Sequence, residues 1–559
     1  MPSVFVNIWI FLVTSFNSVS GSQPKGICSH SPTDRACWGK FDLSTNYYEE
    51  VPYTGVTREY WLNIVNTTAA PDGNERVVLT VNGTIPGPTI IADWGDEVVV
   101  HVKNSMKNNG TGIHFHGIRQ NGTNYMDGVP AVTQCPIAPG DSFTYRWRAS
   151  QYGSTWYHSH FAVQAWDGVQ GGLIINGPAT QNYDVDKGTI LFNDWSPRTA
   201  PVLALESQRS GPPEMSTTLI NGTGVFNGKG ERFSMRFDAG KSYRLRLVNS
   251  AANSFYRVSI DEHIMTVISN DLVAIKPYNT TNLAMGNGQR YDVVVHTKKT
   301  TRGSFWFRIT PQTTCSNHTN PGDVRGIIRY GDNSDDEPNS TPYNLVDACA
   351  DENPNSLVPK LPITASAEYS VISKQEATLQ FVTPTKILWA INNSSFVSRW
   401  DYPTIKQVYE GNDTFTRSQN LIKLPKPDEW FYLIITTNFT RAHPIHMHGH
   451  DFFVLAAGVG NYSDKVPLQL ENSPRRDVAM LPGLGYLVLA IVTDNPGAWL
   501  AHCHIAWHAS EGFALQLLER ESEMLEIEGL LDKDEIEETC ENWESFSTRI
   551  RLQQDDSGI

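Results

Sequence analysis

Four short segments of the 559-residue chain concentrate residues that can bind metal ions. They hold ten of its 16 histidines and one of its 7 cysteines. Imidazole and thiolate are the ligands that copper, zinc and iron–sulfur centres use, so the residue types predict a metal centre. The segments are His114-Phe115-His116, His158-Ser159-His160, His443-Pro444-Ile445-His446-Met447-His448 and His502-Cys503-His504-Ile505-Ala506-Trp507-His508.

The spacing fits two sites on opposite faces of a strand. Residues i and i+2 of a β-strand point to the same face, so each His-x-His presents two imidazoles side by side. In His502-Cys503-His504 the two histidines face one way and Cys503 faces the other. Cys503 with one imidazole each from His443 and His508 makes the His2Cys set of a blue-copper centre. The remaining eight histidines form four pairs that fit a cluster of several coppers between the first and third domains.

A zinc site or a nucleophilic cysteine fits these segments less well. A single His-x-His is often an ordinary polar pair on a strand, but four such pairs, one of them enclosing a cysteine, cannot be accounted for in that way. Zinc prefers four ligands in a tetrahedral site, and eight imidazoles exceed that number. A Cys–His nucleophile is also a poor fit, because the histidines that flank Cys503 point away from its sulfur.

β-strands must position these residues. Short β-rich runs bounded by Asn-Gly, Pro-Gly and Ala-Gly pairs recur along the chain, which is typical of sandwiches and barrels. Loop-like breaks at 177–186 and 332–362 divide the chain into three related β-domains. An acidic, amphipathic stretch at 519–541 predicts a surface helix. Three stretches share one plan of strand, loop and further strand, and the middle one lacks a histidine cluster: 98–118, 243–268 and 430–455.

The N-terminal segment and the cysteines predict a secreted protein. Residues 1–20 hold an apolar run followed by small residues, the pattern of a cleaved signal peptide. Thirteen Asn-x-Ser/Thr sites, for example at Asn66 and Asn221, support an extracellular location. Six cysteines remain beside Cys503, and they allow 15 pairings. Three disulfides are the default in an oxidising compartment.

Charge and hydropathy exclude some partners. The chain has 44 Lys+Arg against 59 Asp+Glu, a formal net charge of −15. It also lacks a basic block, whereas affinity for nucleic acid depends on neutralised phosphates. No stretch reaches the ~20 apolar residues that a membrane-spanning helix needs. We therefore expect neither a nucleic-acid nor a membrane partner. Separately, we expect a monomer.

Taken together, the motifs resemble those of the multicopper oxidases, and among them the ascomycete laccases. The resemblance covers essentially the whole mature chain, including Val81-Asn82-Gly83-x-x-Pro86-Gly87-Pro88 and Thr493-Asp494-Asn495-Pro496-Gly497-Ala498-Trp499. It implies an all-β fold of three cupredoxin-like Greek-key sandwich or barrel domains with a short C-terminal helix and tail. With the signal peptide at 1–20, the domains would span 21–180, 181–360 and 361–559. The second would form a wall of the substrate pocket, and the third would hold the type 1 copper and share the trinuclear cluster with the first.

The same resemblance implies four coppers per chain and a ligand set for each. His443, Cys503 and His508 would hold the type 1 copper, and His114 with His446 the type 2 copper. The type 3 pair would be held by His116, His158, His160, His448, His502 and His504. The disulfides implied in this way are Cys28–Cys37, Cys135–Cys540 and Cys315–Cys349.

Three further positions refine the expectation. Phe513 is the tenth residue after Cys503, where some relatives carry an axial Met, and because Phe cannot ligate copper the potential should rise. Asp127 falls where the family places an acid near the type 2 copper, as a proton relay for oxygen reduction. The C-terminal residues resemble the short plug that enters the channel to the trinuclear site: Asp556, Ser557, Gly558 and Ile559.

One departure concerns the substrate pocket. Ascomycete laccases usually carry an acid beside the phenol pocket in the second domain, and Asn253 stands at the matching position. A carboxylate accepts the phenolic proton as the electron leaves, which an amide cannot do. Asp261 and Glu511 are candidates to substitute for the missing acid.

The resemblance implies a secreted, extracellular laccase-type oxidase, free or associated with the cell wall. It would take single electrons from phenolic and related aromatic donors through the edge of His508. The electrons would pass along Cys503 to His502 and His504, and dioxygen would be reduced to two waters. An oxidase dedicated to coupling one secondary metabolite is an alternative that Asn253 favours. Three further classes fit less well. An ascorbate or bilirubin oxidase would be expected to carry Met at 513, and a metallo-oxidase would be expected to show added acids or a Met-rich segment. A non-catalytic copper-binding cupredoxin protein would be expected to have lost some of the ligands.

Overall fold

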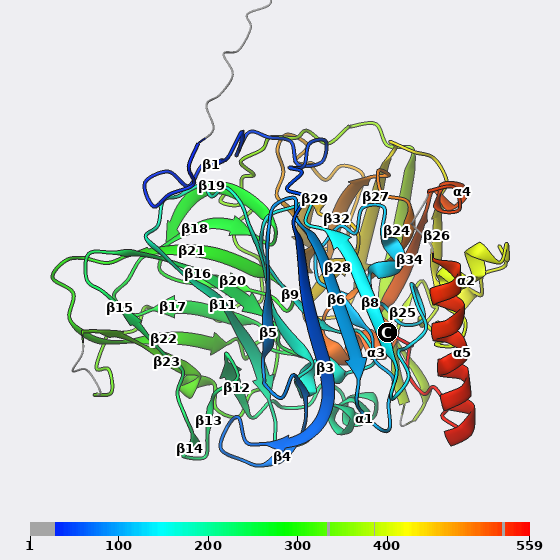
Figure 1. Ribbon diagram of the computed structural model, residues 1–559, viewed down its shortest axis with the longest axis horizontal. Helices are drawn as coiled ribbons and strands as arrows, with labels where there is room; N and C mark the ends of the chain where they lie inside the picture. Colours follow the sequence, from blue (N-terminus) through cyan, green and yellow to red (C-terminus); the bar gives the residue numbers. More distant parts are fainter. Residues whose placement is uncertain (1–27, 332–335, 385, 528–531) are drawn as a thin grey trace, which may run out of the picture.

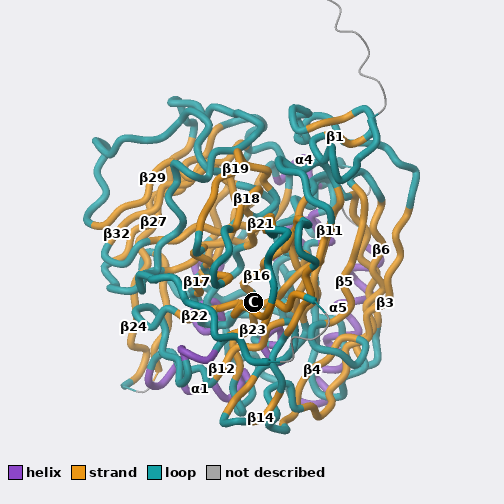
Figure 2. The backbone as a smooth tube through the Cα atoms, turned by 90° about the vertical axis from the view of Figure 1, so that its left-hand side faces the viewer, coloured by secondary structure: helices purple, strands orange, loops and turns teal. Residues whose placement is uncertain are grey.

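Three β-sandwiches account for most of the chain in a computed structural model, which describes residues 28–331, 336–384, 386–527 and 532–559. Figure 1 shows the strands of the second sandwich on the left and those of the third on the right, with β3 and β6 of the first between them. Strands and loops dominate the view in Figure 2, and helices are few. The expected signal peptide, residues 1–20, lies outside the described residues.

The first sandwich has sheets of strand order β4-β3-β6-β8 and β5-β10-β9-β7. Its strands are β3 (Thr57–Ala69), β4 (Arg76–Val81), β5 (Gly87–Asp93), β6 (Glu97–Asn104), β7 (Ile113–Phe115), β8 (Ser142–Arg148), β9 (Gly153–Ser159) and β10 (Gln170–Asn176). Along β6 the burial alternates, with Val98, Val100 and Val102 inside and their neighbours more exposed. This period of two is what makes the strand a sandwich wall.

The second and third sandwiches each pair a six-stranded with a five-stranded sheet. The second contains β11 (Val185–Trp195), β12 (Thr217–Ile220), β15 (Ser234–Phe237), β16 (Ser242–Asn249), β17 (Tyr256–Ile260), β18 (Met265–Asn270), β19 (Val273–Thr280), β20 (Leu283–Met285), β21 (Arg290–His296), β22 (Gly303–Pro311) and β23 (Arg325–Tyr330). The third contains β24 (Val371–Thr383), β25 (Lys386–Ile391), β26 (Leu421–Leu424), β27 (Trp430–Thr437), β28 (His443–Met447), β29 (Phe452–Val459), β30 (Arg475–Arg476), β31 (Val478–Leu481), β32 (Gly485–Val492), β33 (Gly497–Cys503) and β34 (Ala514–Glu519). Short hairpins β1 (Cys37–Trp38) with β2 (Phe41–Asp42), and β13 (Val225–Phe226) with β14 (Lys229–Gly230), lie outside these sheets.

The three sandwiches repeat one plan. In each, an opening strand lies parallel to a later one: β3 to β6, β11 to β16 and β24 to β27. The later strand then pairs antiparallel with β8, β21 or β32. The stretches that share one plan in the sequence begin at β6, β16 and β27, which confirms three related β-domains. The strands that follow are β7, β17 and β28, and β17 is the one that carries no histidine.

Helices are short apart from α5 (Lys533–Ile550). The helix predicted at 519–541 was wrong in position: β34 ends at Glu519, α4 covers only Glu521–Met524, and α5 begins beyond the predicted midpoint. Asp532 accepts a hydrogen bond from the Glu535 N–H and caps α5 at its start. The remaining helices are α1 (Ala200–Ser210), α2 (Thr404–Tyr409) and α3 (Ala506–Ser510), with the 3-10 turns η1 (Asn124–Met126), η2 (Gln164–Asp167), η3 (Pro321–Asp323) and η4 (Arg417–Gln419).

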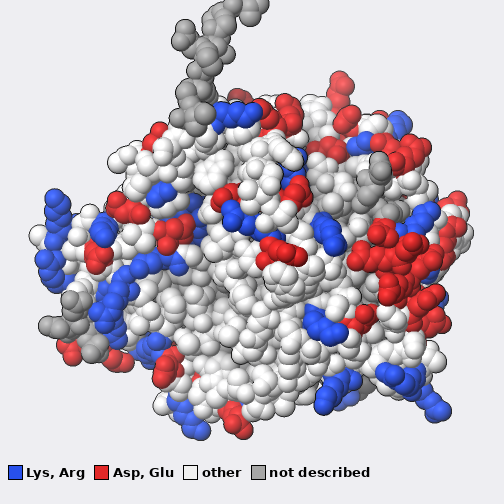
Figure 3. Space-filling view, viewed as in Figure 1, with Lys and Arg blue, Asp and Glu red and all other residues white. Residues whose placement is uncertain are grey.

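α5 is bound to the first sandwich by its buried face. Trp543 and Phe546 are buried in the core that the first sandwich contributes to, and the disulfide Cys135–Cys540 joins helix and sandwich covalently. The outer face of α5 is acidic, as the red cluster at the right of Figure 3 shows. The two other disulfides are Cys28–Cys37 and Cys315–Cys349, so all three pairs are those that the resemblance implied. No helix in the described part of the chain is both long and apolar enough to span a bilayer.

Candidate metal centre

The strand register places Cys503 and its histidine neighbours on opposite faces of one sheet. β28 and β33 run antiparallel with Ile445 opposite Cys503 and His446 opposite His502. His443 is two residues before Ile445, so it lies on the Cys503 face, whereas His446 lies on the face of His502. Two ligand sets therefore form on the two sides of the same sheet.

The first set is His443, Cys503 and His508, the last of which is carried by α3. Cys503 Sγ lies 3.9 Å from His443 Nδ1 and 3.6 Å from His508 Nδ1, and the two nitrogens are 3.2 Å apart. All three side chains are buried. Burial lowers the pKa of His443 to about 3, which keeps its imidazole neutral and able to ligate. Burial also raises the pKa of the Cys503 thiol, which a bound metal would oppose by stabilising the thiolate.

An aromatic wall covers this set. The Trp389 ring centroid lies 4.7 Å from those of both His443 and His508. Phe513 stacks on Trp389 at 5.0 Å and lies 5.2 Å from the His443 ring. Phe513 thus occupies a position beside the set and offers no donor atom, as its sequence position predicted.

The second set is a cluster of eight buried histidines from β7, β9, β28, β33 and the residues that follow these strands. His116 stacks on His446 at 3.9 Å and His114 on His448 at 4.0 Å between ring centroids. Three trios each bring one ligand atom per residue within 4.8 Å of one another. They are His114–His116–His158, His114–His446–His448 and His160–His448–His502.

The cluster fits bound metal, because many of its nitrogens have nothing else to bind. Seven buried ring nitrogens in the cluster lack a hydrogen-bond partner in the described structure, and both nitrogens of His504 are among them. Unpartnered buried polar atoms are costly. Burial first, and neighbouring imidazoles second, hold the pKa of His446 and His448 well below the usual value. Neutral, converging imidazoles are what copper binding requires.

Asp127 contacts the cluster directly behind its ligands. It lies at the end of η1, is fully buried, and its Oδ2 is 2.8 Å from His448 Nδ1. Its carbonyl oxygen is 2.8 Å from His114 Nδ1, and its Oδ1 is 3.2 Å from the same atom. A carboxylate in this place fixes the tautomers of two histidines.

A second acid, Asp477, was missed by the sequence analysis. Its Oδ1 lies 3.2 Å from His116 Nε2, and its carbonyl oxygen lies 2.8 Å from His446 Nδ1. Arg290 donates to its Oδ2 at 2.6 Å, and burial raises the pKa of the carboxyl. The charged run Arg475-Arg476-Asp477 before an apolar strand was a signal that could have pointed to it, because charges are rarely buried unless paired.

The C-terminal tail reaches the cluster. Ile559 is buried and lines a small cavity together with four of the histidines. Ser557 donates from its N–H to the Ser510 carbonyl at 3.0 Å and from Oγ to the Ala509 carbonyl at 2.8 Å. Gly558 has φ +95°, and a Cβ there would lie 2.3 Å from the Ser398 carbonyl oxygen, so glycine is required.

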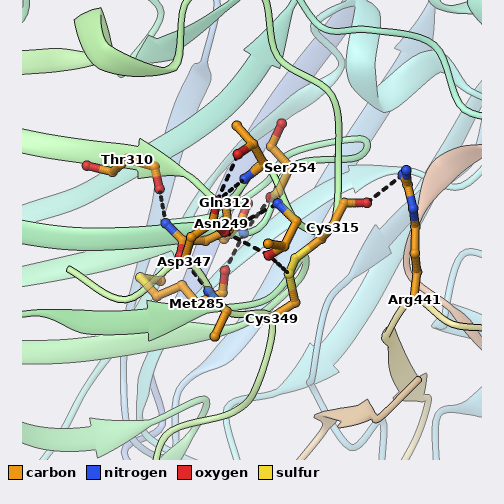
Figure 4. Close-up of a disulfide and its surroundings, with 12 residues drawn as sticks. Asn249, Ser254, Met285, Thr310, Gln312, Cys315, Asp347, Cys349 and Arg441 are labelled. Carbon is orange, nitrogen blue, oxygen red and sulfur yellow. Dashed lines mark hydrogen bonds between the residues drawn. A yellow bond between two sulfur atoms is a disulfide. The ribbon is translucent and has the colours of Figure 1, made fainter. Parts of the chain in front are cut away.

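A cavity of about 300 Å³ opens beside His508. Asn253 and Glu511 both line it, and so does Arg441, whose Nη1 donates to the Cys315 carbonyl at 2.9 Å (Figure 4). Asp261 does not line this cavity. It is buried after β17, and its carboxylate binds Arg308 at 2.8 Å, so it is not the substitute acid.

Comparison with known proteins decides the family. Multicopper oxidase models match residues 63–180, 186–333 and 383–523. The chain belongs to the multicopper oxidase family. Laccase-2 of Botryotinia fuckeliana is 45% identical over 95% of this chain and 94% of its own length. Oxidoreductase OpS5 of Beauveria bassiana is 46% identical over 95% and 93%. The crystal structure of the laccase from Botrytis aclada superimposes with a TM-score of 0.91, at 43% identity, over 95% of this chain and 100% of that one.

The similarity to these relatives identifies this multicopper oxidase as a laccase-type oxidoreductase, and the family implies copper as its metal. The fold of three cupredoxin-like domains is confirmed with it.

Proposed function

We propose that this multicopper oxidase holds four coppers per chain. A type 1 copper would be held by His443, Cys503 and His508, and a type 2 copper by His114 and His446. The type 3 pair would be held by His116, His158, His160, His448, His502 and His504. Copper at the first set would accept single electrons, and copper at the cluster would reduce dioxygen to two waters. The observation that carries this proposal is the convergence of buried His and Cys ligand atoms in two sets, with seven ring nitrogens of the cluster unpartnered in the described structure.

The chain itself connects the two sets. Cys503 is flanked by His502 and His504, so three consecutive residues join the thiolate to the eight-histidine cluster. His508 lies at the wall of the 300 Å³ cavity, which gives a donor molecule access to its edge. The cavity is lined mostly by apolar side chains with a few polar groups, which suits a small phenolic or related aromatic donor.

Asp127 supplies protons to the cluster. Reducing dioxygen to water consumes protons, and a carboxylate within 2.8 Å of His448 can hold and transfer one at Oδ2. The buried tail ending at Ile559 restricts access to the cluster from the opposite side.

Secretion completes the proposal. A leader at 1–20, thirteen glycosylation sequons and three disulfides support an extracellular location, free or associated with the cell wall, and we propose that the protein is a monomer. The domain limits that we propose are 21–180, 181–360 and 361–559.

A phenol oxidase dedicated to one metabolite is the second candidate. Asn253, rather than an acid, lines the donor cavity from the second domain. The 46% identity to an oxidoreductase that is not called a laccase agrees with this second candidate.

Oxygen uptake by the copper-loaded secreted protein tests both candidates. Copper content is measured first, and then uptake is compared between ferrocyanide, which carries no transferable proton, and a panel of simple phenols. Uptake with both donor classes supports a broad laccase, and uptake with ferrocyanide alone supports the dedicated oxidase. Protein with four coppers that takes up no oxygen with either donor would contradict the oxidase function.

A further inference from the structure

Among the described residues that line the cavity beside His508, Glu511 provides the only carboxyl group. It directly follows α3, three residues after His508, and is 4% exposed. Its Oε1 is buried and has no hydrogen-bond partner in the described structure. A buried carboxyl oxygen without a partner is costly, and in a cavity it marks a place where an occupant supplies the missing hydrogen.

Asn253 offers the complementary group from a different domain. Its side chain lines the same cavity, and its buried Nδ2 also has no partner in the described residues. The backbone is held in place there, because the N–H groups of Ala252 and Asn253 donate to the Asp194 carboxylate at 2.7 and 2.9 Å. A phenolic hydroxyl both donates and accepts one hydrogen bond, and among the unpartnered atoms of the described lining residues are one carboxyl oxygen, on Glu511, and one amide nitrogen, on Asn253.

We infer that the Glu511 carboxylate accepts the phenolic proton during donor oxidation, while the Asn253 amide binds the phenolic oxygen. The acid that the second domain lacks is thus supplied by the third. This inference rests on the proposed function, which provides the oxidant.

The step is balanced. The phenolic O–H bond breaks, and its proton forms an O–H bond on Glu511. The oxidant would be the copper that His443, Cys503 and His508 would hold, which would take one electron from the ring and leave a neutral phenoxyl radical. Glu511 returns the proton to solvent before the next donor binds. Removing the proton with the electron avoids a charged radical in an apolar cavity.

The electrostatics of the cavity support a basic carboxylate. Burial raises the pKa of Glu511 to about 8, against an opposing effect of the Ser207 hydroxyl on α1. The other charged or titratable groups that line the cavity are Arg441 and His508. A carboxyl with a raised pKa is protonated at low pH, and its base form grows as pH approaches about 8. The ratio of phenol to ferrocyanide turnover should therefore rise over this range.

Glu511→Gln tests the assignment, because glutamine keeps the size and a hydrogen-bond acceptor but takes no proton. With 2,6-dimethoxyphenol we expect kcat to fall about 10²-fold, the lower end for a lost general base, with KM little changed. The phenol-to-ferrocyanide turnover ratio should fall by the same factor and lose its rise with pH. Glu511→Asp should restore part of it. Glu206→Gln is the matched control, since it removes an acid from α1 that pairs with Arg198 outside the cavity.

Binding gives a readout independent of turnover. Calorimetry compares 4-nitrophenol, a poor electron donor, with its methyl ether 4-nitroanisole. Wild type and Glu511→Gln should both prefer the phenol, and Glu511→Leu should lose this preference. Equal affinity of wild type for the two compounds would contradict a hydrogen-bonded hydroxyl.

The outcomes separate the two proposals. Wild type that oxidises both donors, with an unchanged turnover ratio in Glu511→Gln, overturns the role of Glu511 alone. Copper-loaded wild type that oxidises neither donor overturns the proposed function. Should Glu511→Gln fail to fold, the wild-type pH profiles decide, because parallel profiles for phenol and ferrocyanide between pH 5 and 8 would exclude Glu511 as the base.

Discussion

The two ligand sets are linked by three consecutive residues, His502, Cys503 and His504, but are assembled by different parts of the fold. The His443–Cys503–His508 set comes from the third sandwich alone, through β28, β33 and α3. The eight-histidine cluster takes four residues from the first sandwich and four from the third. Folding of one domain therefore completes the first set, whereas the second also requires two domains to dock. His502 and Cys503 are adjacent on β33, yet assembling the ligand set around His502 requires a second folded domain and assembling the set around Cys503 does not.

The residues that surround the two ligand sets also differ. Trp389 and Phe513 cover the smaller set with aromatic rings. Asp127, Asp477 and Arg290 surround the cluster with buried charges. In the proposed function the smaller set would only pass on single electrons and would need no protons from the protein, whereas the cluster would make water and would need them. This difference would account for the carboxylates that contact the histidines of the cluster.

Removing the Cys503 thiolate should have the largest effect. Cys503→Ser leaves two imidazoles and a hydroxyl that is a poor copper ligand. We expect complete loss of blue absorption and of donor oxidation, while elemental analysis still finds the coppers of the cluster. A variant that stays blue and active would contradict the assignment of Cys503.

Loss of the disulfide between α5 and the first sandwich should destabilise the eight-histidine cluster more than the His443–Cys503–His508 set. Replacing Cys135 and Cys540 together by Ser removes a cross-link between residues 405 apart in sequence, and we expect a loss of about 2–5 kcal/mol. Thermal melting with copper analysis should show the cluster emptying before the type 1 site loses its colour. Replacing Cys28 and Cys37, which are 9 apart, is the control and should leave the order and the midpoint nearly unchanged.

Asp127→Asn should slow only the cluster. The amide keeps the size of the side chain but cannot cycle a proton beside His448, and we expect reoxidation by dioxygen to slow about 10–100-fold. Stopped-flow reduction of the blue centre by ferrocyanide should remain as in wild type. Equal slowing of both half-reactions would show that Asp127 acts on the structure rather than on proton supply.

Phe513→Met should change the reduction potential of the copper at the His443–Cys503–His508 set and leave the cluster unaffected. A thioether beside His443 and Cys503 can act as an axial ligand and stabilise Cu(II). We expect the potential to fall by about 59 mV or more, which is a tenfold change in the one-electron equilibrium constant. Redox titration of the blue band measures it, with Phe513→Leu as the control that adds no donor. An unchanged potential in the Met variant would show that the side chain does not reach the metal.

The packing of the C-terminal tail, residues 556–559, against the protein should depend weakly on pH. Burial raises the pKa of Asp556 to about 7, so the unfolded tail ionises near pH 4 while the seated tail keeps its proton. Seating is therefore strongest below about pH 4 and weakens as pH rises toward 7. Hydrogen exchange at Ser557 and Gly558 should be several-fold faster at pH 7 than at pH 4 after correction for intrinsic rates, and Asp556→Asn should remove the difference.

Local patterns in the sequence were enough to predict much of this fold. The stretches predicted at 98–118, 243–268 and 430–455 begin within one residue of the starts of β6, β16 and β27, because runs of β-branched and aromatic residues bounded by turn signals are visible in a local window. The helix predicted at 519–541 was displaced because its buried face depends on a distant surface. The ring centroid of Trp543 lies 5.8 Å from those of Phe161 and Trp400, which are too distant in the sequence to appear in the pattern around the helix.

The sequence by itself was enough to predict the metal chemistry that we propose, because the strand period of two fixes which faces His502, Cys503 and His504 occupy. Tertiary structure alone decided what surrounds the metal sites. His116 meets Asp477 across 361 residues, and Glu511 rather than Asp261 reaches the donor cavity. Neither contact follows from the residues that neighbour these acids in the chain. Only the packing of three domains settled which carboxyl is paired with an arginine and which is left free to accept a proton.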